Sequence, residues 1–378
     1  MPHLFVDISS HGFGHLAQTA PILNELAERL RGLSLTLRCG LPAEIVRSRI
    51  HHRFDLISSA SDFGCVMKDA TSIDAEKTAE AYRLLHADWE RRLDEETAFL
   101  ASLQPDLALT NVAYLPLAGA KRAKIPAVSM CSLNWADLFG HFFGKRAWAA
   151  PIHHQILSAY NDADVFFRIT PGMPMKRLTR ARSVAPVAIL GEDRRAELKE
   201  RLRCGNNGKI ILIAFGGIEK RLPAARWPLS PERRWIIPQS WNIERPDMTP
   251  FETLGWNFTD LLRSVDAVLT KPGYGTFAES ACNGTATLFL KRNDWPEQKP
   301  LIDWLKANAR CQEIAPDALR EGKFDETLTA LWSQTPPRPP RPSGIREITE
   351  QLLCLLDPSA EKTPGTHSQS KSKDGSCK

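Results

Sequence analysis

The first half of the chain alternates short apolar runs with segments that carry apolar residues at helical spacing. The run HLFVDIS at 3–9 has the pattern of a buried strand, and the segment after it places Leu16 and Leu23 on one helix face. Five more strand-like runs follow, LSLTLRC, FDLISSA, DLALTNV, PAVSMCS and DVFFRIT. One long helix is expected from about Asp74 to just before Pro105. Strand and helix taking turns in this way predicts a parallel sheet with helices on both faces.

The same alternation restarts in the second half. KIILIAFGGI at 209–218 is a strand that ends in a Gly-Gly turn, and AVLT at 267–270 is another. A helix is expected from about Tyr274, then the strand ATLFLKR and a helix over LIDWLKANAR. The stretch 222–250 shows no clear period beyond a short strand in RWIIPQ. The second half therefore predicts a second α/β unit.

Length and composition support two domains. At 378 residues the chain is long for one average domain, and the proline-rich, basic segment 170–186 interrupts the alternation. We therefore expect domains at 1–190 and 191–356, the second including a final helix over 345–356. The tail 357–378 is rich in Ser, Lys and Gly and is expected to be disordered.

Charge and cysteine content restrict the class of function. The net charge of +5 is spread along the chain, which argues against a nucleic-acid partner and leaves room for an anionic ligand. The eight cysteines are scattered without C-x-x-C spacing, which is typical of a reduced protein without a zinc site. No signal peptide or membrane-spanning run is found, so a cytoplasmic location is expected.

Contact with the inner face of a membrane stays open because of one segment. Residues 134–151, NWADLFGHFFGKRAWAAP, are aromatic and apolar with a basic pair. They fit a patch that faces an acceptor or a membrane surface, and they fit a buried helix and loop equally well.

The turn SSHGFGH stands between the first strand and its helix, where ligands bind in parallel α/β sheets. Gly12 and Gly14 let a ligand approach the backbone, and the helix start offers free N–H groups. His11 and His15 have imidazoles suited to general-base chemistry near neutral pH. The alternative is that the glycines only make a tight turn and the histidines fill space.

A second constellation lies in 269–305. Lys271 and the turn at Gly273, Tyr274, Gly275 and Thr276 follow a strand and open a helix, an arrangement that suits phosphate. On that helix Glu279 can reach the hydroxyl groups of a ligand, and NDWPEQ supplies Glu297 and Gln298 for a sugar. Each of these residues alone has an ordinary structural explanation, and it is their grouping at two strand ends that favours phosphate and polyol binding.

These motifs resemble the GT-B glycosyltransferases that use nucleotide sugars, in the branch of MurG and the UDP-glucuronosyltransferases. A closer likeness is to the glycosyltransferase-like N-terminal part of plant L-arabinokinases, which carries a G-H-G-F-G-H turn and a K-x-G-Y-G-T motif. The likeness covers roughly residues 3–310. It departs from many relatives at Lys271-Pro272, where they have His-Gly, and 222–250 has no counterpart.

The resemblance implies two Rossmann-like domains facing across a cleft and a hexosyltransferase-like activity. A nucleotide diphosphate sugar, UDP-linked by this likeness, would bind the C-terminal domain through Gly216, Gly217 and the residues at 271–276, with Glu279 on the ribose and Glu297 and Gln298 on the sugar. On the acceptor side, His15 would deprotonate a hydroxyl that attacks with inversion, while His11 orients the turn or contacts the sugar.

No cofactor or metal is expected. Asp162-Ala163-Asp164 spells D-x-D but precedes a strand of the acceptor domain, where a surface turn is the better interpretation. A nucleotide-sugar hydrolase or epimerase on the same fold, and a non-catalytic binder of nucleotide sugars, stay as alternatives. The acceptor is not identified.

Overall fold

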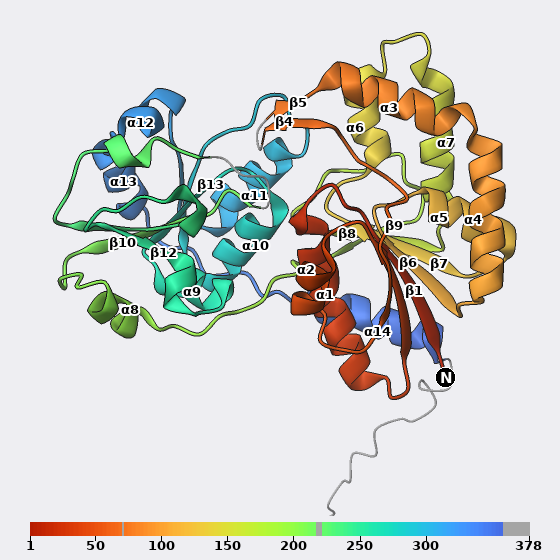
Figure 1. Cartoon of the computed structure of the whole chain (residues 1–378), viewed down its shortest axis with the longest axis horizontal. Coiled ribbons are helices and arrows are strands. Elements are labelled where there is room, and N and C mark those ends of the chain that lie inside the picture. The colour runs from red at the N-terminus through yellow and green to blue at the C-terminus, as the bar shows by residue number, and fades with distance from the viewer. Residues whose placement is uncertain (70–71, 217–220, 358–378) are drawn as a thin grey trace, which may run out of the picture.

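The protein folds into two α/β halves, each with its own parallel sheet (Figure 1). The computed structural model describes residues 1–69, 72–216 and 221–357. The tail expected to be disordered therefore lies, apart from Asp357, outside the described residues, as does Gly217.

The N-terminal half is built on a seven-stranded sheet in the order β3-β2-β1-β6-β7-β8-β9. All six neighbouring pairs run parallel, so the predicted parallel sheet is confirmed. The strands are β1 (His3–Ile8), β2 (Ser34–Cys39), β3 (Asp55–Ile57), β6 (Leu107–Asn111), β7 (Ala127–Cys131), β8 (Val165–Ile169) and β9 (Ala181–Val184). A short antiparallel pair, β4 (Met67–Asp69) and β5 (Ser72–Ile73), stands apart from this sheet.

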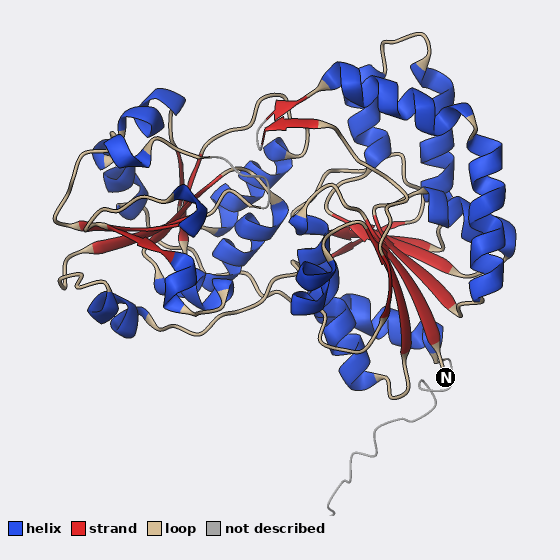
Figure 2. Ribbon diagram, in the orientation of Figure 1, coloured by secondary structure: helices blue, strands red, loops and turns tan. Residues whose placement is uncertain are grey.

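Helices cover both faces of this sheet because successive strand residues point to opposite sides. Leu4, Val6 and Ile8 pack toward α1 (Phe13–Arg29) and α2 (Ala43–Arg49). Helices lie on both sides of the sheet (Figure 2). Phe5 belongs to a separate buried cluster. The helices of that cluster are α3 (Ala75–Ala87), α4 (Trp89–Leu103), α5 (Leu115–Ala123), α6 (Trp135–Phe143) and α7 (Ala149–Asn161).

The single long helix expected after Asp74 is wrong, because the chain forms α3 and α4 with a break between them. Asp88 leaves helical geometry, with φ −113° and ψ 41°. The apolar positions lie on both sides of the break and pack against the same sheet face, so periodicity alone did not show the interruption.

The C-terminal half is built on a six-stranded parallel sheet in the order β12-β11-β10-β13-β14-β15. Its strands are β10 (Lys209–Ile213), β11 (Arg233–Ile237), β12 (Met248–Pro250), β13 (Ala267–Thr270), β14 (Ala286–Phe289) and β15 (Cys311–Glu313). Its helices are α8 (Arg195–Arg201), α9 (Phe258–Ser264), α10 (Tyr274–Asn283), α11 (Gln298–Asn308), α12 (Pro316–Glu321) and α13 (Asp325–Trp332). The stretch 222–250 supplies β11 and the edge strand β12, together with two 3-10 turns, η1 (Ala224–Arg226) and η2 (Gln239–Trp241). A third turn, η3 (Phe251–Leu254), follows.

The two halves share apolar contacts and a helix. One buried cluster contains residues of α1 together with Phe277 and Ala281 of α10. The last helix, α14 (Gly344–Leu356), returns to the N-terminal half and buries Ile348 and Leu352 against the α1 side of its sheet (Figure 1). The division of the chain at 190 stays a prediction. The strand ends of β1 and β13 both lead into turns at the junction of the halves, and the candidate residues lie there.

Candidate functional site

The first turn leaves β1 at Ile8 and enters α1 at Phe13. Gly12 has φ 167° and ψ 172°, which is extended backbone that any residue can adopt. A Cβ atom added to Gly12 or to Gly14 would meet no heavy atom within 4 Å. Neither the backbone nor the packing therefore requires glycine here, and what remains is open space beside the main chain at the start of a helix.

His15 is held by Asn111, the last residue of β6. Its Nδ1 lies 2.9 Å from Oδ1 of Asn111, and the amide nitrogen of Asn111 donates to the backbone oxygen of His15 at 3.1 Å. The amide thus turns its oxygen to the imidazole, so Nδ1 carries the proton and Nε2 is the free acceptor. His15 is 6% exposed, and burial lowers its pKa to about 4, so the ring is neutral at pH 7.

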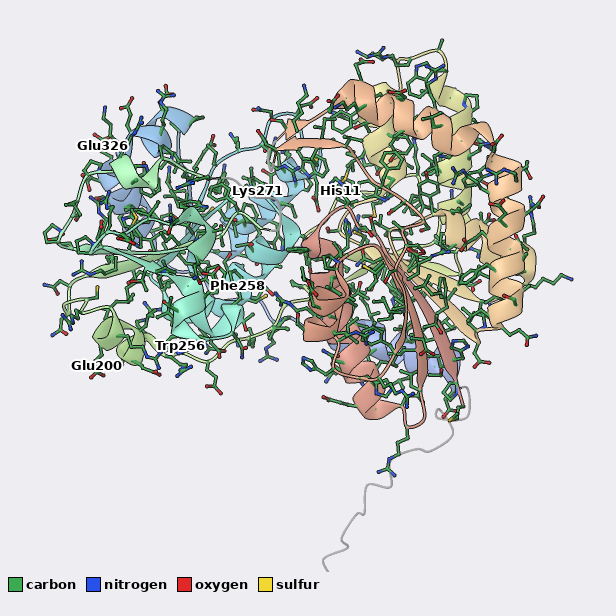
Figure 3. The ribbon with its side chains drawn as sticks, viewed as in Figure 1. His11, Glu200, Trp256, Phe258, Lys271 and Glu326 are labelled. Carbon is green, nitrogen blue, oxygen red and sulfur yellow. The ribbon has the colours of Figure 1, made fainter. Side chains whose placement is uncertain are left out.

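His11 joins the two halves instead of standing free. Its Nδ1 accepts a hydrogen bond from the backbone N–H of Cys65 at 3.2 Å. Its ring stacks on Trp295 of the C-terminal half, with centroids 5.9 Å apart and planes 4° apart, and lies edge-on to Trp135 at 5.2 Å. Burial and the nearby charges of His15, Arg292 and Lys271 lower its pKa to about 3. His11 is therefore a neutral contact at the junction (Figure 3).

In the C-terminal half two of the predicted glycine turns lie close to the amine of Lys271. The Nζ atom of Lys271 lies 3.9 Å from the position of a Cβ on Gly216 and 3.6 Å from that of a Cβ on Gly273. Gly216 has φ +81°, which favours glycine, and Gly273 is the N-cap of α10. Within the described residues the amine has no carboxylate within 4 Å, and burial beside Arg292 lowers its pKa to about 8.

Glu279 lies in the second turn of α10, as expected. Burial raises its pKa to about 7, and the positive charge of Arg49, at the end of α2 in the other half, opposes that shift. Gly275 and Thr276 lie in the first turn of the same helix, and a Cβ on Gly275 would meet no atom within 4 Å. The start of α10 thus combines free space, N–H groups and a lysine.

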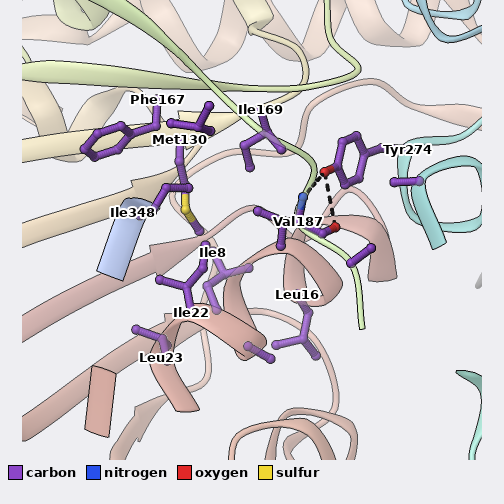
Figure 4. Close-up of a cluster of buried hydrophobic side chains, with 14 of the residues drawn as sticks. Ile8, Leu16, Ile22, Leu23, Met130, Phe167, Ile169, Val187, Tyr274 and Ile348 are labelled. Atoms are coloured by element: carbon purple, nitrogen blue, oxygen red, sulfur yellow. Dashed lines mark hydrogen bonds between the residues drawn. The ribbon is translucent and has the colours of Figure 1, made fainter. Parts of the chain in front are cut away.

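Tyr274 has a structural partner that its motif did not indicate. Its hydroxyl lies 2.8 Å from the backbone N–H of Val187 and accepts that hydrogen bond (Figure 4). The same oxygen lies 3.2 Å from the carbonyl of Val187. The side chain is buried in the cluster shared by the two halves, so it ties α10 to the segment that connects them.

Glu297 and Gln298 are close in sequence but face different partners. Glu297 is 4% exposed and accepts from Ser132 Oγ at 2.7 Å and from Trp295 Nε1 at 3.1 Å. Gln298 bonds the backbone N–H and C=O of Arg292, both at 3.0 Å. Glu297 thus contacts the N-terminal half directly, while Gln298 fixes the loop that carries Arg292.

Sequence reasoning missed four residues of this junction, namely Arg292, Trp295, Asn111 and Ser132. The side chain of Arg292 is 9% exposed, its guanidinium lies 3.8 Å from the ring centroid of Trp295, and its Nε has no hydrogen-bond partner among the described residues. A signal existed, since each of these residues ends a strand or follows one at its carboxyl end, the edge where ligands bind. The spacing of apolar residues does not report such polar positions.

Two side interpretations are also resolved. Asp162 and Asp164 precede β8, at the sheet edge away from the first turn, and Asp164 accepts from the backbone N–H of Ala127 at 3.0 Å, so this D-x-D is a turn as expected. In the segment 134–151 the rings of Trp135, Phe139 and Phe143 are buried, whereas Lys145 and Arg146 are exposed, so its helix packs inward and the basic pair lies at the surface. Among the described helices, none has the length and apolar character needed to cross a membrane.

Comparison with known proteins places the fold. No protein-family model matches the sequence. The chain is 22% identical over 346 residues to L-arabinokinase of Arabidopsis thaliana; the match covers 87% of this chain and 32% of that protein, so the chain spans about a third of the relative.

Solved structures match over the whole length. The calicheamicin glycosyltransferase CalG4 has a TM-score of 0.60 at 17% identity, covering 95% of this chain and 96% of CalG4. The spinosyn forosaminyltransferase SpnP has 0.57 at 16%, covering 94% and 99%. Phytolacca americana UGT2, complexed with UDP-2-fluoro-glucose and pterostilbene, has 0.53 at 15%, covering 95% and 96%. The chain therefore has the GT-B fold, and the expected resemblance is confirmed at that level.

Proposed function

We propose that the protein is a glycosyltransferase that moves a sugar from a UDP-linked donor to a hydroxyl acceptor, with inversion and without a metal ion. The observation that carries this proposal is the meeting of two sets of residues at one junction. His15 with its free Nε2 stands on one side, and Lys271 between the Gly216 turn and the start of α10 stands on the other. The charge of Lys271 contributes to the lowered pKa of His11, which supports the proximity of the two sets.

On the acceptor side, the imidazole of His15 acts as general base. Its Nε2 takes the proton of the acceptor hydroxyl as the oxygen forms a bond to the anomeric carbon of the donor. Asn111 keeps Nδ1 protonated, so the histidine cannot present the wrong nitrogen. Because the acceptor attacks from the face opposite the leaving group, the configuration at that carbon inverts.

On the donor side, the bond from the anomeric carbon to the diphosphate oxygen breaks, and the electron pair leaves with UDP. The negative charge that develops is met by Lys271, by the N–H groups at the start of α10 and by Arg292. Arg292 suits this role because it is buried over Trp295 with an Nε that lacks a partner within the described residues. These groups would replace a metal ion as the source of positive charge.

The remaining donor contacts are those that the resemblance to nucleotide-sugar glycosyltransferases implies. Glu279 would accept hydrogen bonds from the ribose hydroxyl groups, and Glu297 with Gln298 would hold the sugar. Phytolacca americana UGT2, a protein of the same fold, holds a UDP-linked sugar analogue, which supports UDP as the first nucleotide to test. His15 is 6% exposed and Glu297 is 4% exposed, so the substrates enter only when the two halves move apart.

Calorimetric titration with UDP, GDP, dTDP and CMP tests the donor site. We expect UDP to bind, and Glu279→Ala to weaken it at least about tenfold, because a charged hydrogen bond contributes roughly 1.5–3 kcal/mol. Glu25→Ala, at a half-buried helical glutamate that pairs with Arg29 away from the donor residues, is the matched control and should bind UDP as the wild type does.

Absence of binding for all four nucleotides by folded protein contradicts the proposal. Binding combined with release of free sugar or an epimer, in the absence of an acceptor, identifies a nucleotide-sugar hydrolase or epimerase instead. Binding that tolerates His15→Ala, with no turnover of any donor, identifies a non-catalytic binder.

A further inference from the structure

A second site lies in the N-terminal half, beside the residues assigned above. A cavity of about 460 Å³ is enclosed by the loop at 60–63 and by side chains of β2, α3, α4 and the start of α5. Ligand sites in proteins have volumes of roughly 300–1,000 Å³, so the cavity is large enough for a monosaccharide. None of its lining residues belongs to the donor site or to the first turn.

Three buried polar atoms that lack a hydrogen-bond partner within the described residues belong to side chains that line this cavity. They are Oγ of Ser61, Oδ1 of Asp62 and Nε of Arg92. A buried polar group that is left unpaired loses its hydrogen bonds to water without replacing them, which is unfavourable. Three such atoms around one cavity indicate that a polar ligand supplies the missing partners.

Asp62 is the most constrained of the three. The residue is 7% exposed, and its Oδ2 accepts a hydrogen bond from Nε1 of Trp135 at 2.7 Å. This bond fixes the carboxyl group and leaves Oδ1 buried, with no hydrogen-bond partner at normal geometry within the described residues. Burial and the charge of Asp7 raise the pKa of Asp62 to about 7, against the opposing effects of Ser9, Trp135 and Arg38.

The charges on the cavity wall separate into used and unused groups. Arg38 is occupied by Asp7 and by Glu96, whose two oxygens lie 2.9 and 2.6 Å from its guanidinium. Glu95, the third carboxylate of the lining, pairs with Arg91. Arg92 makes no ion pair within the described residues, so its guanidinium can receive an anion. Phe63, Leu85 and Phe99 give the wall apolar surface for the C–H faces of a sugar ring.

We propose that this cavity binds a monosaccharide-sized polyol that carries a carboxylate or a phosphate, with the anionic group at Arg92 and hydroxyl groups at Asp62 and Ser61. The ring of Trp135, which Asp62 holds, lies 5.9 Å from the ring of His15. Neither His15 nor Trp135 lines the cavity, so its ligand does not contact the general base directly. The cavity proposal does not rest on the proposed function.

The test is calorimetric titration of the full chain at pH 7 with D-glucuronate, D-glucose 1-phosphate and D-glucose. We expect at least one of the two anionic sugars to bind at least tenfold more tightly than glucose, and the comparison of carboxylate with phosphate identifies the anionic group. Arg92→Gln should remove that advantage, and Arg92→Lys should restore part of it. Asp62→Asn, which keeps an acceptor for Trp135, should weaken binding at least tenfold.

Two readouts separate ligand contact from a structural role. Ionisation of Asp62 by a bound hydroxyl releases protons at pH 7, so the binding heat should depend on the buffer in wild type and not in Asp62→Asn. Arg122→Gln is the control, because Arg122 is an exposed arginine of the same half that pairs with Glu90 and Asp94 outside the cavity. It should bind as the wild type does.

The proposal is overturned if folded wild-type protein binds neither anionic sugar, or if binding is unchanged in both Arg92→Gln and Asp62→Asn. UDP is titrated into the same preparations. UDP binding without sugar binding overturns the cavity proposal and leaves the donor site intact, while sugar binding without UDP binding supports the cavity and counts against the glycosyltransferase.

Discussion

Oδ1 of Asn111 lies 2.9 Å from Nδ1 of His15, and the amide nitrogen of the same asparagine donates to the backbone carbonyl of that histidine. The two contacts fix the orientation of the amide and the tautomer of the ring together. Burial lowers the pKa of His15 to about 4, and the hydrogen bond to the neutral Asn111 opposes that shift only in part, less than a carboxylate would.

Replacing Asn111 by aspartate should therefore change the pH dependence of activity. Below its pKa of about 4 the wild-type His15 is protonated and cannot act as a base, so the acid limb of kcat/KM should lie near pH 4. A carboxylate stabilises the imidazolium, so Asn111→Asp should move that limb to higher pH. An unchanged limb in pH–rate profiles of the variant would show that His15 is not the base. Asn111→Ala, which loses the tautomer control, should lower kcat by at least about tenfold.

The lowered pKa of Lys271 predicts that the affinity for the nucleotide falls in the alkaline range. Its pKa is lowered to about 8, so the amine is charged below that pH and neutral above it. The affinity for UDP should fall between pH 7 and pH 9. Lys271→Met should bind about 10- to 100-fold more weakly at pH 7, because a charged contact contributes roughly 1.5–3 kcal/mol.

Lys271→Met also shows how much of the pH dependence comes from titration of the nucleotide, because the variant lacks only the amine and keeps all other titratable groups of the protein. Lys299→Met, at an exposed lysine paired with Asp303, should retain the wild-type pH dependence. An equally steep decline in Lys271→Met and in the wild type would remove Lys271 from the phosphate site.

The variant Gly14→Ala distinguishes an effect on folding stability from an effect on ligand access. It lies in the first turn of α1, and a Cβ added there would meet no heavy atom within 4 Å, so Gly14→Ala should fold and gain up to about 1 kcal/mol of helix stability. A methyl group would nevertheless occupy the space beside the backbone that a ligand needs. We expect an unchanged or higher Tm by thermal denaturation together with at least a tenfold loss of activity. Full activity in this variant would mean that no ligand passes there.

Much of the fold could be predicted from the sequence, because alternating strands and amphipathic helices leave a strong periodic signal. The signal fails where an apolar face continues across a break, as at Asp88, and where a strand is as short as β12. The packing of α14 against the N-terminal half depends on contacts between residues remote in sequence. The sequence therefore predicted the helix but not the surface against which it packs.

The positions of the candidate residues could be predicted because ligands of parallel α/β folds commonly bind at turns that follow the carboxyl ends of strands. His15, Lys271 and Glu279 lie at the junction of the halves as the motifs indicated. The partners that set their chemistry were not visible, because Asn111 and Arg292 reach them only through the folding of distant strands. Tyr274 belonged to the motif, but its hydroxyl contacts the backbone of Val187.

Ser132 and Glu297 should contribute to the attachment of the two halves. Their hydrogen bond is 2.7 Å long and buried, so Ser132→Ala should lower the free energy of unfolding by about 1–3 kcal/mol and decrease the Tm. Ser102→Ala, which removes an exposed hydroxyl bonded only within its own helix, is the control for loss of a serine. Equal Tm values for the two variants would show that the contact does not hold the halves together.

The most direct measurement is release of UDP from UDP-sugars in the presence of EDTA and a mixture of hydroxyl-bearing acceptors, for the wild type and His15→Ala. The expected result is release that depends on the acceptor, continues in EDTA and decreases about 100-fold or more in the variant, since a general base contributes roughly 10²–10⁴ in rate. Equal release by wild type and variant, or activity that is abolished by EDTA and restored by a divalent cation, would contradict a metal-independent transfer with His15 as its base.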